Sequence, residues 1–67
     1  MVDVTDSSPP NAGSLYQAAL EMERRTRDHF QKLSRELPAG LERELCAELA
    51  AEEDEHVALL EGELEQL

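Results

Sequence analysis

A chain of 67 residues forms at most one small domain, and its apolar side chains are mainly Leu and Ala, with one Phe, one Tyr and no Trp. A single core in a chain of fewer than roughly 70–80 residues seldom stabilises a fold alone, so we expect dependence on self-association or on a metal ion. The formal net charge of −10, from 16 acidic and 6 basic residues, argues against nucleic acid and anionic membranes as partners and favours cations.

The chain contains one cysteine, Cys46, which excludes an internal disulfide framework and a zinc site built from cysteine pairs. No apolar run approaches the ~20 residues of a membrane-spanning helix. Residues 1–14 also lack the basic-then-apolar pattern of a signal peptide. We therefore expect a protein of the reducing cytoplasm.

Residues 1–14 contain Ser-Ser-Pro-Pro and Asn-Ala-Gly without hydrophobic periodicity, which is typical of a flexible N-terminal arm. Ser14 followed by Gln17 is a capping-box pattern, and it predicts a helix over about residues 15–37. Along this helix, apolar or unusual positions recur about every 3.5 residues. They are Tyr16, Ala19, Leu20, Glu23, Thr26, Phe30, Leu33 and Leu37.

Pro38 ends the first helix, and Gly40 gives the chain the freedom to turn. A second helix is expected over about residues 41–66. Its stripe consists of Leu45, Leu49, Glu52, Glu53, His56, Leu60, Leu64 and Leu67, widened by Cys46, Ala50 and Val57. Because the connection is so short, residues 15–67 should form an antiparallel helical hairpin of the all-α class.

Three polar residues lie inside these stripes at mirrored distances from the turn. Glu23 lies 16 residues before Ala39, while Glu53 and His56 lie 14 and 17 residues after it. In an antiparallel hairpin, residue 23 faces residue 55, so the three side chains should meet at one level. A carboxylate opposite a Glu-x-x-His pair is half of a carboxylate-bridged dinuclear metal site. Two copies of the chain would complete it.

Other interpretations of the same residues remain open. The Glu-x-x-His pair lies in an acid-rich stretch that is also compatible with a solvated face, and Glu23 is also compatible with an arginine partner at a dimer interface. The chain would then be a non-enzymatic acidic module for oligomerisation or docking, without metal. A third interpretation is structural zinc or calcium bound at the same three residues.

The pattern over residues 15–67 resembles one half of a rubrerythrin-type, ferritin-like bundle. That family carries a helix with Glu-x6-Tyr, a short turn and a helix with Glu-x-x-His, matched here by Glu23 with Phe30, and by Glu53 with His56. The motif occurs twice in a full-length family member and once here, as in the encapsulated ferritins. Two departures are Phe30 in place of the usual Tyr and the lack of a cargo-targeting tail.

The resemblance implies a homodimer, or a higher homo-oligomer, built as a ferritin-like four-helix bundle with two iron ions per dimer. Its implied activity is that of a ferroxidase, oxidising Fe(II) to Fe(III) for storage or detoxification, with manganese or zinc as possible substitutes. Glu23, Glu53 and His56 would be both the metal ligands and the catalytic residues, and Glu53 the bridging one. An encapsulin-type shell is one compartment that the resemblance allows.

The remaining chemical side chains are expected to have structural roles. We interpret Tyr16 as core filler, Cys46 as a buried thiol and His29 as a surface residue. Glu52 and Glu55 should be solvated. Three arginines of the first helix should pair with the acidic second helix, within the hairpin or across chains: Arg24, Arg25 and Arg27.

Overall fold

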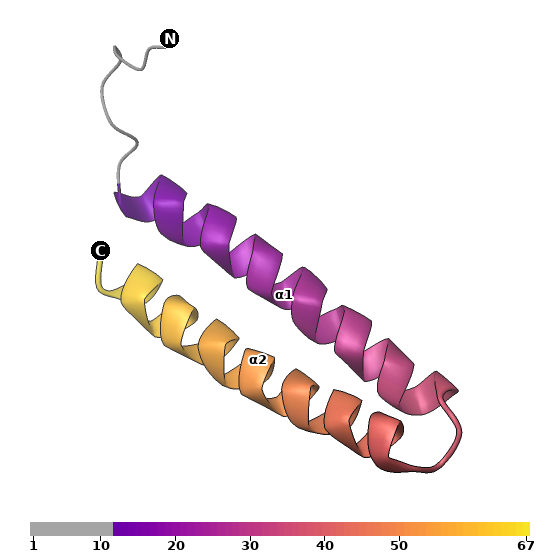
Figure 1. Cartoon of the computed structure of the whole chain (residues 1–67). Helices are drawn as coiled ribbons and strands as arrows, with labels where there is room; N and C mark the ends of the chain where they lie inside the picture. Colours follow the sequence, from indigo (N-terminus) through magenta and orange to yellow (C-terminus); the bar gives the residue numbers. More distant parts are fainter. Residues whose placement is uncertain (1–11) are drawn as a thin grey trace, which may run out of the picture.

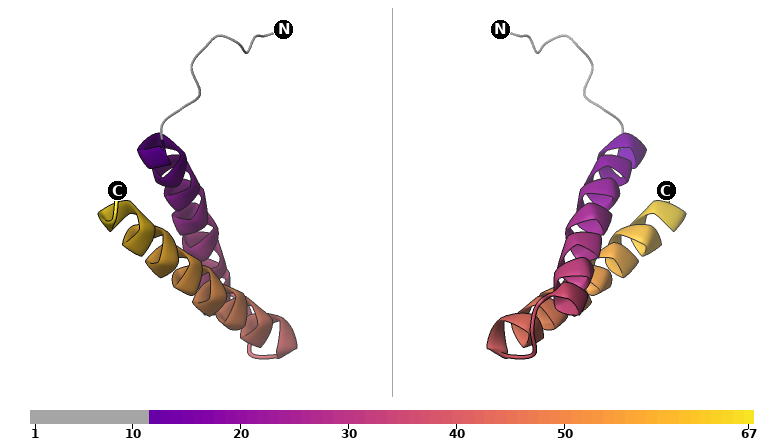
Figure 2. Two further views of the ribbon diagram at one scale, coloured as in Figure 1. Left: turned by 90° about the vertical axis from the view of Figure 1, so that its left-hand side faces the viewer. Right: turned by 90° about the vertical axis from the view of Figure 1, so that its right-hand side faces the viewer.

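The computed structural model describes residues 12–67 and shows two α-helices folded back on one another (Figure 1). Helix α1 spans Ala12–Glu36 and helix α2 spans Leu41–Glu65, and each has 25 residues. The helices are antiparallel, and the side views show that they cross at an angle (Figure 2). Neither helix is long and apolar enough to span a membrane. The all-α hairpin expected from the sequence is confirmed.

Helix α1 begins three residues earlier than the capping-box pattern predicts. It starts at Ala12, so Ser14 lies inside the first turn and is not the N-cap. Alanine has the highest helix propensity, and serine is tolerated in the first turn because a hydroxyl can accept from backbone N–H groups that have no intrahelical partner. Of the predicted arm 1–14, residues 1–11 lie outside the described residues.

The turn between the helices owes its shape to Pro38 and Gly40. The last bond of α1 runs from the Leu37 N–H to the Leu33 carbonyl, at 2.9 Å, and Pro38 cannot continue this ladder. Gly40 has φ +156°, a backbone conformation that residues with a Cβ rarely adopt. Its carbonyl accepts the Glu44 N–H at 3.1 Å, which opens α2.

The core between the helices is small. Only three of the described side chains are buried: Leu20 of α1, and Ala50 and Val57 of α2. The sequence had suggested that Ala50 and Val57 only widen the stripe of α2, but they form its centre. No large side chain among residues 12–67 is fully buried, so this hairpin excludes little apolar surface from water.

Several large apolar side chains share one exposed side of the hairpin. Leu15 and Met22 are 58% and 66% exposed, and Leu45 is 51% exposed. Successive residues of an α-helix are about 100° apart around its axis. On this basis the three side chains lie roughly a quarter to a third of a turn round their helix from the side that contacts the other helix. Because the helices are antiparallel, this rotation brings them to the same side, which we call the apolar face: Leu15, Met22 and Leu45, bordered by Leu59.

Ion pairs join the flanks of the two helices. The Arg24 guanidinium lies 2.7 Å from a carboxylate oxygen of Glu61, and that of Arg27 lies 3.0 Å from one of Asp54. The sequence predicted these links between the basic first helix and the acidic second one. Arg25 differs, because it pairs with Glu21 of its own helix at 3.1 Å.

Candidate metal centre

Glu23, Glu53 and His56 meet between the two helices. Each side chain offers one potential ligand atom, and these atoms all lie within 4.8 Å of one another. The Nδ1 atom of His56 lies 3.3 Å from the Glu23 Oε1 atom and 3.2 Å from the Glu53 Oε1 atom. Among residues 12–67, this is the one group of three such side chains with metal-ligand spacing. The structure thus brings together the three residues that the mirrored spacing selected.

The helices hold this cluster at their middle. The midpoint of α1, Ala12–Glu36, is residue 24, and the midpoint of α2, Leu41–Glu65, is residue 53. Glu53 and His56 are three residues apart, so both project from one side of α2 toward Glu23. The turn fixes which residues of α1 and α2 are opposite each other, and the buried residues Leu20 and Val57 lie three residues before Glu23 and one residue after His56 in the sequence.

The cluster is open on one side. The side chains of Glu23 and Glu53 are 33% and 21% exposed, whereas that of His56 is 55% exposed. His56 lies about a quarter of a turn round α2 from the contact with α1, in the direction of the apolar face. The Nδ1 edge of its ring points to the carboxylates, which leaves the Nε2 edge on the exposed side. The centre therefore lies at the inner border of the apolar face.

The proximity of two carboxylates determines the protonation of the cluster. A hydrogen bond between Glu23 and Glu53 lowers the pKa of Glu23, and His56 lowers it further. The same hydrogen bond raises the pKa of Glu53, with desolvation and the charge of Glu23 adding to the effect. Contact with Glu23, and then with Glu53, raises the pKa of His56. Glu53 and His56 of the metal-free cluster therefore hold their protons to a higher pH than the isolated side chains do, and a bound divalent cation would compete with those protons.

The donor set suits a transition-metal ion. Two carboxylate oxygens and one imidazole nitrogen are the ligands preferred by iron, manganese and zinc, while calcium prefers oxygen ligands alone. Three donors from one hairpin leave further coordination positions for a second copy, for water or for an oxidant. A bridging role is open to Glu53, because a carboxylate has two oxygens.

One side chain beside the centre differs from the sequence expectation. Arg27, rather than Thr26, occupies the side of α1 that contacts α2, and its side chain is only 23% exposed. The Thr26 hydroxyl donates instead to the Met22 carbonyl of its own helix, at 3.0 Å. The sequence already indicated this position of Arg27. The residues of α1 that face α2 follow an alternating spacing of four and three, which includes residue 27 and not residue 26: 16, 20, 23, 27 and 30.

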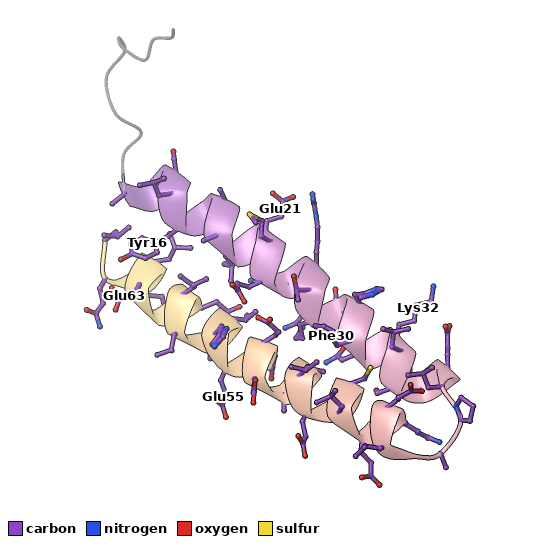
Figure 3. The ribbon with its side chains drawn as sticks, in the orientation of Figure 1. Tyr16, Glu21, Phe30, Lys32, Glu55 and Glu63 are labelled. Carbon is purple, nitrogen blue, oxygen red and sulfur yellow. The ribbon has the colours of Figure 1, made fainter. Side chains whose placement is uncertain are left out.

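The other candidate side chains surround the centre without joining it. Phe30 points from α1 toward α2 and is half-buried, while Glu55 points away from α1 (Figure 3). Tyr16 lies near the C-terminal end of α2, well along the helix from Glu23. Cys46 is a half-buried free thiol, and His29 is exposed with its ring centroid 5.8 Å from that of Phe30.

Comparison with known proteins adds no assignment to this geometry. No protein-family model, no curated protein and no solved structure matches the chain.

Proposed function

We propose that this chain is a di-iron carboxylate protein that oxidises Fe(II) to Fe(III) at a site shared between two copies. The observation that carries the proposal is the convergence of Glu23, Glu53 and His56 at the middle of the hairpin, with all three ligand atoms within 4.8 Å. Such a group combines the donor types of a carboxylate-bridged iron site.

Two copies are needed because one hairpin offers half a ligand set. Each chain supplies two carboxylates and one imidazole, so a dimer supplies four carboxylates and two imidazoles, the complement of ferritin-like di-iron bundles. The exposure of His56 and of the neighbouring apolar face supports this arrangement, because a second hairpin would cover both. The dimer would be a homodimeric four-helix bundle of ferritin-like type, with higher oligomers built from it.

Fe(II) is the substrate of the proposed reaction, and dioxygen or peroxide is the oxidant. Two Fe(II) ions each lose one electron, and one dioxygen molecule takes up both electrons and two protons to give hydrogen peroxide. With peroxide as oxidant, two further electrons and two protons give two water molecules. The two-electron step explains why two neighbouring iron ions are required.

The side chains of the chain hold and orient the substrate. Glu53 is the proposed bridging ligand, Glu23 a terminal ligand, and His56 binds through Nδ1, the ring atom that faces the carboxylates. The negative charge of α2 attracts Fe(II) toward the centre. Fe(II) competes with any proton on Glu53 or His56, and the exposed side of the cluster gives a displaced proton a route to solvent.

A non-enzymatic docking module is the second candidate. It is favoured by one observation, that the hydrogen bonds of His56 to Glu23 and Glu53 satisfy the cluster without any ion. In that case the purified, folded protein would self-associate or bind a partner while containing no metal.

The decisive experiment is anaerobic loading with Fe(II), followed by exposure to air while ferric absorbance and oxygen uptake are recorded. We expect two iron ions per dimer and rapid oxidation. Glu53→Ala should be the most damaging change because a bridging ligand serves both ions, with Glu23→Ala and His56→Ala also strongly impaired. Glu55→Ala is the matched control, because this exposed carboxylate points away from α1 (Figure 3). Parent-like rates in all three ligand variants would refute the ferroxidase proposal.

A further inference from the structure

We infer that a second copy docks on the apolar face with its turn at the opposite end, so that the partner's Glu52 meets His56. This inference rests on the proposed shared site. In this arrangement, a two-fold axis crosses the hairpin perpendicular to the helices, α1 lies beside the partner's α1, and α2 lies beside the partner's α2. The occupant of the apolar face is thus an inverted copy of the same hairpin.

The position of the metal cluster favours such an axis. Glu23 and Glu53 lie within one residue of the midpoints of α1 and α2, and the two helices have equal lengths. An axis through this level therefore superposes the whole length of one hairpin on the other, without an overhanging end. It also brings the two clusters together at one level, which a shared pair of ions requires.

Two pairs of leucines meet each other under this rotation. If the axis crosses α1 at residue 24, residues at equal distances on either side of residue 24 face each other. Leu15 then faces the partner's Leu33, and Met22 faces the partner's Thr26. The axis then crosses α2 near residue 54, so Leu49 faces the partner's Leu59. Leucines of one copy thus cover the exposed Leu15 and Leu59 of the other, whereas Leu45 lies at the level of the partner's Glu63.

The same rotation gives the half-exposed His56 a partner. Glu52 and His56 are equidistant from the level of residue 54, so each His56 faces the partner's Glu52. Since Nδ1 of His56 points to Glu23 and Glu53, its Nε2–H is the group left to donate to that carboxylate. A carboxylate on the second nitrogen of a ligating histidine fixes its tautomer and ring orientation. Glu52 thus acts as a positioning residue across the interface.

This orientation places two acidic helices side by side. Residues 41–67 contain ten acidic residues and one arginine, so two neighbouring α2 helices repel each other in the absence of cations. The opposite orientation, with both turns at one end, would instead place each α2 beside the partner's more basic α1. Bound cations at the shared centre offset the repulsion in the inverted pair, so the orientation and the metal centre depend on each other.

A spin label on the turn distinguishes the two orientations. Ala39 is exposed in the turn, and Ala39→Cys in a Cys46→Ser background carries one label per chain. With diamagnetic Zn(II) bound, the inverted pair places the labels about 45 Å apart, since 15 residues at about 1.5 Å separate each turn from the axis. Pulsed EPR should report that distance. A distance below about 20 Å would overturn the inferred orientation.

Two further measurements separate this inference from the proposed function. Zinc binding measured by calorimetry on the same labelled protein tests the centre itself, and its absence would refute the metal site whatever the orientation. Glu52→Gln should weaken the zinc-loaded dimer about tenfold in sedimentation, whereas Glu55→Gln, which only removes a repulsive charge, should leave it equal or tighter. Equal effects of the two variants would overturn the role of Glu52.

Discussion

The Nδ1 atom of His56 lies 3.3 Å from a carboxylate oxygen of Glu23, although 33 residues separate the two in the chain. Like the Arg24–Glu61 and Arg27–Asp54 ion pairs, this contact depends on the correct pairing of the two helices. A shift of α2 by one residue would rotate His56 by about 100° and remove it from Glu23. This contact therefore reports both the length of the turn and the register of the hairpin.

Self-association is the first expected property of the chain. A hairpin with three buried side chains has too small a core to remain folded alone, so the protein should sediment as a dimer or larger species at micromolar concentration. Leu45→Glu on the apolar face should shift the protein toward monomer. Ala51→Glu, on the exposed opposite side of α2, is the matched control and should not. A folded monomer of the parent chain would contradict the shared site.

Metal binding should stabilise the fold. A ligand present at about 100 times its dissociation constant adds about 2.7 kcal/mol to the free energy of unfolding. In a domain of this size, that corresponds to a rise in melting temperature of roughly 10 °C or more. We expect such a shift in melting temperature with Zn(II) or Co(II) at pH 7, and circular dichroism during heating measures it. Glu53→Ala should abolish the shift, and an unshifted parent would show that the three side chains bind no cation.

In the metal-free protein, His56 should remain protonated to a higher pH than an isolated histidine side chain does. Contact with Glu23 raises the pKa of His56, so the stabilising contribution of the protonated ring is complete below its ordinary value of about 6.5. That contribution is lost as pH rises through the raised value. An NMR titration of the ring should show the raised pKa in the parent, and Glu23→Gln should lower it. Glu55→Gln should leave it as in the parent, and an equal response to both variants would exclude the contact.

Gly40 and Gly62 should respond to alanine in opposite directions. Gly40→Ala should lower the free energy of unfolding by about 1–3 kcal/mol, because φ +156° is strained for any residue with a Cβ. Gly62→Ala should raise it by about 0.5–1 kcal/mol, since Gly62 is helical and nothing lies within 4 Å of the added methyl group. Chemical denaturation of both variants measures the contrast, and equal losses would contradict this view of the turn.

The turn and the level of the centre could be predicted because they depend on local chemistry. Pro38 and Gly40 mark the break, and counting from Ala39 places Glu23 opposite Glu53 and His56. The start of α1 could not be predicted, since a capping-box pattern such as that at Ser14 also occurs inside helices.

Residues at the border of a stripe were also ambiguous. Thr26 and Arg27 differ by about 100° on the helix, and only the packing of α1 against α2 shows that Arg27 faces α2. The exposure of His56 is decided in the same way, by how the two helices cross rather than by local sequence. The pairing of Arg25 with Glu21 likewise depends on side-chain geometry along a single helix.

The central position of the cluster also determines how steadily its side chains are held. Helices open from their ends, so amide hydrogens near Ala12 and Glu65 should exchange with solvent first, and those around Glu23 and Glu53 last. About three turns of helix protect the cluster in each direction along both helices. The backbone beneath the three side chains thus stays ordered while the ends fray, which keeps the ligand atoms in place before any ion arrives.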